Sequence, residues 1–127
     1  MKISELPWSF PEPRPHYPEL YVTGVGQDGD LVERLISEGV SIVFSALPDS
    51  PASQIEEDLA MSGLVVISHS TIHRHSEKVP LIVPEVNNGH LKLTDSQTEY
   101  EGGMLVSCSN CMVVPLAISL APLIRSL

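Results

Sequence analysis

Basic residues are scarce in this chain. Its seven Lys and Arg stand against sixteen Asp and Glu, which gives a formal net charge of −9. Proteins bind polyanions through Lys and Arg side chains that neutralise phosphates, so this balance argues against nucleic acid as a partner. The same scarcity disfavours binding to an anionic membrane surface.

Cysteines and long apolar runs are also scarce. Two cysteines cannot build a disulfide-rich scaffold. Residues 1–10 hold no apolar core of a secretory signal. The apolar run at residues 112–127 is shorter than the roughly 20 residues that cross a bilayer, and it contains two prolines. We therefore expect a cytoplasmic protein with free thiols and no membrane segment.

Proline is abundant in the N-terminal part. Five of the 11 prolines fall in the first 18 residues. Because proline fixes φ and lacks an amide donor, we expect residues 1–19 to form an extended or irregular arm. We expect Trp8, Phe10 and Tyr17 to pin this arm to a surface.

Beyond the arm, apolar runs alternate with helical patterns. Residues 40–46 are β-branched and nearly all apolar, which is typical of a strand covered on both faces. Ser50 is expected as an N-cap with Pro51 at the first helical position, and Gly39 and Gly63 as helix stops. The other expected strands are 20–23, 64–67, 79–83 and 103–107, and the expected helices are 30–38, 50–61, 88–97 and 112–125. The alternation predicts an α/β layered domain with buried parallel strands.

The candidate site lies at the ends of the expected strands, because ligands of a parallel α/β sheet bind at the carboxyl ends of its strands. The segments that follow the strands are small or polar. For any single segment the alternative is an ordinary polar turn. The segments are residues 45–48, 68–70, 84–87 and 109–111.

Cys111 lies where the last expected strand gives way to a helix. Amide groups at a helix N-terminus stabilise an anion, which lowers the pKa of a cysteine placed there. A thiolate so placed is a nucleophile suited to attack a carbonyl carbon. The alternative is a buried, inert cysteine.

Cys108 and Cys111 also form a C-x-x-C pair, the spacing of a redox dithiol or of half a zinc site. A structural zinc site needs four ligands, and the available His73 and His75 alternate sides on an extended chain. We therefore expect no metal site, and we interpret Cys108 as the end of the buried strand.

Four motifs in register give the chain a family resemblance. The matching pieces are FSALP (44–48), VIS-x-S-x-x-HR (66–74), VPLIVPEVN-x-x-HL (79–91), and SNC followed by an apolar helix that ends in APL (109–123). They resemble the aspartate-semialdehyde dehydrogenase family, particularly its archaeal and fungal type. The resemblance implies an incomplete Rossmann-like parallel sheet, the C-terminal part of an NADP-binding domain, over residues 20–108. Residues 109–127 would then be the nucleophile loop and helix.

The resemblance also implies an activity. The family uses NADP and phosphate to interconvert aspartate 4-semialdehyde and aspartyl phosphate through a cysteine thioester, on the route to lysine, methionine and threonine. It assigns the nucleophile to Cys111 and support of the oxyanion to the backbone around Asn110. It assigns phosphate binding to Arg74, because a guanidinium fork meets phosphate oxygens in pairs. The alternative for Arg74 is a solvated surface arginine.

Cofactor contacts follow from the same resemblance. The implied residues are Ser45, Ala46, Leu47, Pro48, Ser68, His69 and Asn87. Two substitutions depart from the family: His69 stands where asparagine is usual, and Met112 stands where serine is usual. Residues 23–29 are only an echo of the family's glycine-rich phosphate turn.

The chain resembles a middle segment of a longer enzyme, because the family's histidine base and substrate-carboxylate arginine lie in a domain that this sequence does not match. The complete enzyme would be a homo-oligomer, and we expect the 127-residue chain alone to be inactive. Two alternatives stay open. One is a related acyl-phosphate or malonyl-CoA reductase, and the other is an inactive remnant that acts as a binding or assembly module.

Overall fold

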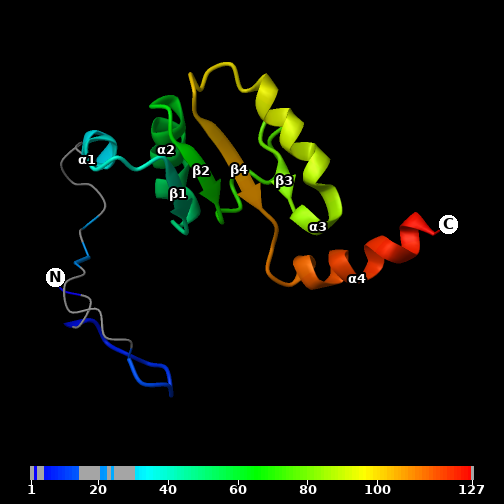
Figure 1. Ribbon diagram of the computed structural model, residues 1–127, viewed down its shortest axis with the longest axis horizontal. Helices are drawn as coiled ribbons and strands as arrows, with labels where there is room; N and C mark the ends of the chain where they lie inside the picture. Colours follow the sequence, from blue (N-terminus) through cyan, green and yellow to red (C-terminus); the bar gives the residue numbers. More distant parts are fainter. Residues whose placement is uncertain (1, 3–4, 15–20, 23, 25–30, 127) are drawn as a thin grey trace. The chain divides into compact units, whose positions relative to one another are not determined.

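The computed structural model describes residues 2, 5–14, 21–22, 24 and 31–126. The chain divides into two compact units, Met1–Leu31 and Val32–Leu127. The second unit holds the sheet and its helices (Figure 1). The arm predicted for residues 1–19 lies within the first unit.

Aromatic and cationic side chains contact one another in the first unit. The centres of the Trp8 and Phe10 rings lie 5.2 Å apart, and Trp8 Nε1 donates a hydrogen bond of 2.8 Å to the carbonyl of Glu12. The Arg14 guanidinium lies 5.6 Å from the centre of the Trp8 ring, within range of a cation–π interaction. Trp8 and Phe10 therefore pack against each other within the arm. Tyr17 lies outside the described residues.

The strand predicted at residues 20–23 is represented by a single position. Tyr21 forms an isolated antiparallel bridge with Lys2. Residues 20 and 23 lie outside the described part of the chain.

Four parallel strands form the sheet of the second unit, in the order β1-β2-β4-β3. Val43, Val66 and Leu105 are paired in register on three neighbouring strands, so their side chains share one face of the sheet. This confirms the predicted α/β class with a partial Rossmann-like parallel sheet. The strands are β1 (Ile42–Ser45), β2 (Val65–Ser68), β3 (Leu81–Ile82) and β4 (Met104–Cys108).

The prediction that the first of these strands is covered on both faces is wrong. β1 is an edge strand, and Ile42 and Phe44 are 52% and 75% exposed, whereas Ser45 is buried. Side chains alternate along a strand, so Ile42 and Phe44 share one face of β1, whereas Val43 packs against the core on the opposite face. A run of apolar residues indicates that a strand can be buried, but the packing of other elements decides which of its faces is covered.

The helices are α1 (Leu31–Ser37), α2 (Asp49–Met61), α3 (Pro84–Asn87), the 3₁₀ helix η2 (Asn88–Ser96) and α4 (Val113–Arg125). The predicted stops are confirmed, because Gly39 and Gly63 follow α1 and α2 with positive φ angles of 74° and 87°. The predicted helix at 88–97 is confirmed as the 3₁₀ helix η2, which follows directly on α3.

The prediction for the start of α2 is wrong. Pro48, and not Ser50, is the N-cap residue, and the Pro48 carbonyl accepts the first helical hydrogen bond from the amide of Ala52 at 3.0 Å. Pro51 therefore lies within the first turn. Its missing N–H costs no hydrogen bond there, because the first amides of a helix have no partner in the helix.

The core lies between α2 and the sheet, because α2 packs against β2 and β4. Val32 and Leu35 of α1 add to it from the side. Burial of this apolar surface is the main favourable contribution to folding. The core residues are Leu59, Ala60, Leu64, Val66, Val79 and Leu105.

Gln97 takes the place of a strand residue beside β4. The short β3 pairs with Ser107 and Cys108 at the far end of β4. Nearer the start of β4, the buried Gln97 side chain accepts a hydrogen bond from Leu105 N at 3.0 Å and donates to the carbonyls of Leu105 at 2.8 Å and Lys78 at 2.9 Å. Buried backbone groups need partners, so this amide completes the hydrogen bonding of β4 where β3 does not reach.

Gly103 gives a direct test of the packing between α2 and β4. A Cβ atom at this position would lie 2.0 Å from the carbonyl oxygen of Ala60 and 2.9 Å from that of Leu64. We expect Gly103→Ala to lower the free energy of unfolding by about 1–3 kcal/mol or more, because the backbone must shift. Gly89→Ala is the control, since a Cβ there would meet nothing within 4 Å. Equal stability of the two variants in urea unfolding would contradict the packing.

α4 exposes an apolar surface. In Figure 1 it follows β4 and runs on beyond the carboxyl end of the sheet. Leu116, Leu123 and Ile124 are 58%, 60% and 70% exposed. Exposed apolar patches of this kind drive association.

We therefore expect the 127-residue chain to self-associate through α4. The double substitution Leu116→Gln and Leu123→Gln should raise the monomer fraction measured by light scattering. Ile36→Gln on α1 is the control, because Ile36 is 51% exposed but lies apart from α4 in the sequence. A clean monomer of the unsubstituted chain at high concentration would contradict this expectation.

Candidate active site

A cavity of about 620 Å³ lies at the carboxyl ends of β2, β3 and β4. This is the end of a parallel sheet at which ligands bind. His69 and Arg74 line it from the segment that follows β2, and Cys108, Asn110 and Cys111 line it from β4 and the connection to α4. The other lining residues are Ile82, Val83, Pro84, Ser109, Val114 and Pro115.

The charge of the cavity suits an anion. Arg74 contributes a permanent positive charge. Within the described part of the chain, none of the residues that line the cavity is acidic. An anionic group that enters it would therefore meet a cation without a competing carboxylate in the wall.

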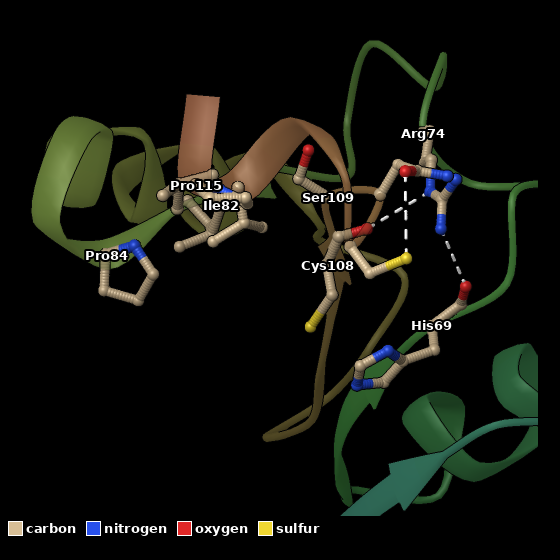
Figure 2. A pocket seen from close by; sticks show the side chains of 11 residues that line it. His69, Arg74, Ile82, Pro84, Cys108, Ser109 and Pro115 are labelled. Carbon is tan, nitrogen blue, oxygen red and sulfur yellow. Dashed lines mark hydrogen bonds between the residues drawn. The ribbon is translucent and has the colours of Figure 1, made fainter. Parts of the chain in front are cut away.

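Arg74 connects the ends of β2 and β4. Its Nε donates a hydrogen bond to the carbonyl of Cys108 at 3.2 Å, and its Nη2 donates to the carbonyl of His69 at 3.0 Å (Figure 2). A guanidinium carries more N–H donors than these bonds use. Arg74 is thus half-buried and fixed in place, unlike the solvated arginine of the alternative reading, and it retains donors for a ligand.

The two cysteines are free thiols with different surroundings. Cys111 is exposed at the cavity, with its Sγ 3.9 Å from Asn110 Oδ1. Burial raises the pKa of the Cys108 thiol, and the nearby Arg74 charge offsets this in part. A raised pKa leaves less of the Cys108 thiol as thiolate at neutral pH, so burial makes Cys108 a poorer nucleophile than an ordinary exposed cysteine.

Asn110 shapes the turn that presents Cys111. Its Oδ1 accepts a hydrogen bond from the amide of Met112 at 2.8 Å, and its carbonyl accepts from the amides of Val113 and Val114 at 2.9 and 3.1 Å. Met112 is the N-cap residue of α4 and makes no side-chain cap hydrogen bond, so the acceptors at the start of α4 come from Asn110. These amides are engaged by Asn110, so support of an oxyanion by this backbone stays a prediction.

The other expected cofactor residues lie outside the cavity wall. Ser45 and Ser68 end β1 and β2 in register, and the amide of His69 donates to the Ser45 carbonyl at 2.9 Å. Ala46, Leu47 and Pro48 follow at the same edge of the sheet. The structure therefore brings His69, Arg74, Asn110 and Cys111 together, and it sets the Ser45 and Ser68 segments beside them.

Asn87 has a local structural contact. Its Oδ1 accepts a hydrogen bond from the amide of Val83 at 2.7 Å, and its Nδ2 donates to the carbonyl of Leu81 at 2.9 Å. These bonds connect β3 to α3. A contact of Asn87 with a cofactor stays a prediction.

The sequence reasoning missed two carboxylates of α2. Asp49 accepts hydrogen bonds from Ser70 Oγ at 2.5 Å and from the amide of Thr71 at 2.8 Å, and also from Thr71 Oγ1. Glu56 Oε2 lies 2.9 Å from His73 Nε2, and both side chains are buried. Asp49 is an acid in the first turn of α2, which signals a contact with backbone amides but not with a distant loop, and no sequence pattern pairs Glu56 with His73.

Two negative findings bear on the site. Among the described residues, no group of three or more His, Cys, Asp or Glu side chains is placed to hold a metal ion. No helix in the described part of the chain is long and apolar enough to cross a membrane.

The parallel sheet with a crevice at its carboxyl edge defines a nucleotide-binding type of α/β domain, here with an arginine and an exposed cysteine in the crevice. The sequence model of one family, the semialdehyde dehydrogenase NAD-binding domain, matches residues 17–94. The chain belongs to this family. The match ends before Cys111, so it does not test the role of that residue.

Known relatives agree with the family. Aspartate-semialdehyde dehydrogenase of Archaeoglobus fulgidus is 44% identical over 84 residues, which are 65% of this chain and 24% of that protein. A malonyl-CoA reductase (NADP) of Metallosphaera sedula is 37% identical over 93 residues, 72% of this chain and 26% of that protein. The crystal structure of the Candida albicans aspartate-semialdehyde dehydrogenase with NADP matches with a TM-score of 0.60 at 32% identity, over 67% of this chain and 26% of that one. The chain thus spans about a quarter of the length of these relatives.

Asp49 gives a pH-dependent prediction. Hydrogen bonds from the Ser70 and Thr71 side chains and from the Thr71 amide lower its pKa from 3.8 to about 2. Because the folded-state pKa lies below the unfolded value, the carboxylate stabilises the fold above a pH of about 3.8, and this contribution is lost as the pH falls toward 2. The difference in unfolding free energy between the wild type and Asp49→Asn should therefore shrink over that range. A difference that stays constant as the pH falls would contradict the contact.

Proposed function

We propose that the chain is the nucleophile-bearing segment of an aspartate-semialdehyde dehydrogenase, which interconverts aspartate 4-semialdehyde and aspartyl phosphate with NADP and phosphate. The observation that carries this proposal is the cavity that combines the exposed Cys111 thiol with the fixed Arg74 guanidinium. Archaeal and fungal relatives named aspartate-semialdehyde dehydrogenase support it. Because the chain spans about a quarter of their length, we expect no turnover from it alone.

Cys111 is the proposed nucleophile. Its thiolate adds to the aldehyde carbon of the substrate, a C–S bond forms, and the carbonyl oxygen takes the negative charge. The exposure of Cys111 at the cavity and its place before α4 support this role. Asn110 holds the turn in which the thiol is presented.

Arg74 is the proposed phosphate-binding residue. Its guanidinium is fixed by the carbonyls of His69 and Cys108, so little side-chain entropy is lost when an anion binds. Its position in the same cavity as Cys111 supports this role, because a phosphate bound to it would lie near the carbon that the thiol attacks. Once the adduct has been oxidised to the thioester, attack of phosphate on its carbonyl carbon breaks the C–S bond and releases aspartyl phosphate and the thiolate.

The carboxyl edge of β1 and β2 holds a polar atom that a cofactor could bind. Ser45 Oγ is buried and lacks a hydrogen-bond partner within the described residues, and the backbone of residues 46–48 leads out from it. The residues present thus fit a cofactor at this edge, where Ser45, residues 46–48, Ser68 and His69 would hold it. When bound, NADP supplies the hydride acceptor for oxidation of the thiohemiacetal.

For the complete enzyme we also predict a homo-oligomer and a cytoplasmic location.

A second candidate has a specific observation in its favour. The Metallosphaera sedula relative, named a malonyl-CoA reductase (NADP), matches over a larger share of this chain than the archaeal dehydrogenase does. In that reading, Cys111 attacks a thioester carbon and expels coenzyme A. The same cysteine then serves a different substrate.

Labelling of the two thiols tests the proposal. Iodoacetamide should alkylate Cys111 severalfold faster than Cys108 near neutral pH, because Cys111 is exposed and burial raises the pKa of Cys108. Aspartate semialdehyde should slow the labelling of Cys111, because addition to the aldehyde occupies the thiol. Mass spectrometry of the two peptides measures both rates.

Cys108→Ala is the matched control, since it should leave the rate at Cys111 and the protection by substrate unchanged. Protection by malonyl-CoA alone would favour the second candidate. Equal, slow labelling of both thiols with no protection would contradict both, and would favour the inactive remnant.

A further inference from the structure

Helix α2 contacts the loop that carries Arg74 at two separate points. The loop follows β2, which ends at Ser68. Near its start, Asp49 binds Ser70 and Thr71, and further along Glu56 meets His73, the neighbour of Arg74. One helix therefore holds the loop on both sides of its turn.

We propose that Asp49 is a positioning residue for Arg74. It acts through the loop and touches neither substrate nor cofactor. The part of the inference that concerns phosphate rests on the proposed function of Arg74. The part that concerns the orientation of the guanidinium stands on the geometry alone.

The hydrogen bonds of Asp49 go to an unusual place. An acid in the first turn of a helix commonly accepts bonds from the free amides of that turn. Asp49 instead accepts bonds from residues 21 and 22 positions further along the chain. The Asp49 carboxylate thus accepts three hydrogen bonds from the loop. Its main contacts are with the loop, and its role as a first-turn acid of α2 is secondary.

A continuous path of hydrogen bonds leads from Asp49 to the cavity. Thr71, held by Asp49, accepts a bond at its carbonyl from the amide of Arg74 at 3.2 Å. The Arg74 side chain then binds the carbonyls of His69 and Cys108. Loss of Asp49 would free the turn at Thr71 and with it the base of the Arg74 side chain.

The second contact fixes the far side of the turn. Glu56 is fully buried and His73 is 5% exposed, and their nearest atoms lie 2.9 Å apart. The atoms meet at hydrogen-bond distance but not with hydrogen-bond alignment, since both remain without such a partner within the described residues. The hydrogen bonds that anchor the loop to α2 are therefore those of Asp49.

The experiment follows the Arg74 Nε–H signal by NMR in the full 127-residue chain. We expect Asp49→Ala to speed its hydrogen exchange by about tenfold or more, because the bond to Cys108 would open more often. Titration with inorganic phosphate should show a similar loss of affinity. Asp58→Ala is the matched control: it removes the same charge from α2, but Asp58 accepts its hydrogen bond from Gln54 on the same helix.

The outcomes separate the two claims. Unchanged exchange of the Arg74 signal in a folded Asp49→Ala variant would overturn the positioning role. Faster exchange in a chain that binds no phosphate even as the wild type would support positioning and reject the phosphate site. If Asp49→Ala does not fold, Thr71→Val removes one donor alone and should give a smaller rise in exchange, and no rise would count against the proposal.

Discussion

The candidate site depends on the bonds of one guanidinium to two main-chain carbonyls. Arg74 binds the carbonyls of His69 and Cys108, and thereby connects the ends of β2 and β4. Because the strands are parallel, these ends meet at one edge of the sheet. The cavity, the exposed thiol of Cys111 and the cationic wall all follow from that arrangement.

Helix α2 serves both the core and the site. Its buried face supplies Leu59 and Ala60 to the core, and the backbone of Ala60 comes so close to Gly103 that a side chain there has no room. Its first turn supplies Asp49 to the loop of Arg74. The helix that packs on the sheet therefore also binds the loop of Arg74.

Two apolar surfaces of the described residues stay exposed. The chain spans about a quarter of its relatives' length, and it exposes apolar side chains on β1 and α4. Phe44 is 75% exposed and Ile124 is 70% exposed. Burial of such apolar side chains against another surface is favourable, and the described residues do not bury them.

Local patterns determined much of this protein. Glycine stops, β-branched runs and the small polar segments after each strand predict the α/β class, and the SNC motif places Cys111 before a helix. Only the tertiary structure decided that β1 lies at the edge, that Pro48 caps α2, and that Asp49 reaches a loop 22 residues away. The physical reason is range: propensity and periodicity act within a few residues, whereas edge position, partner choice and burial of Glu56 against His73 arise from contacts between distant segments.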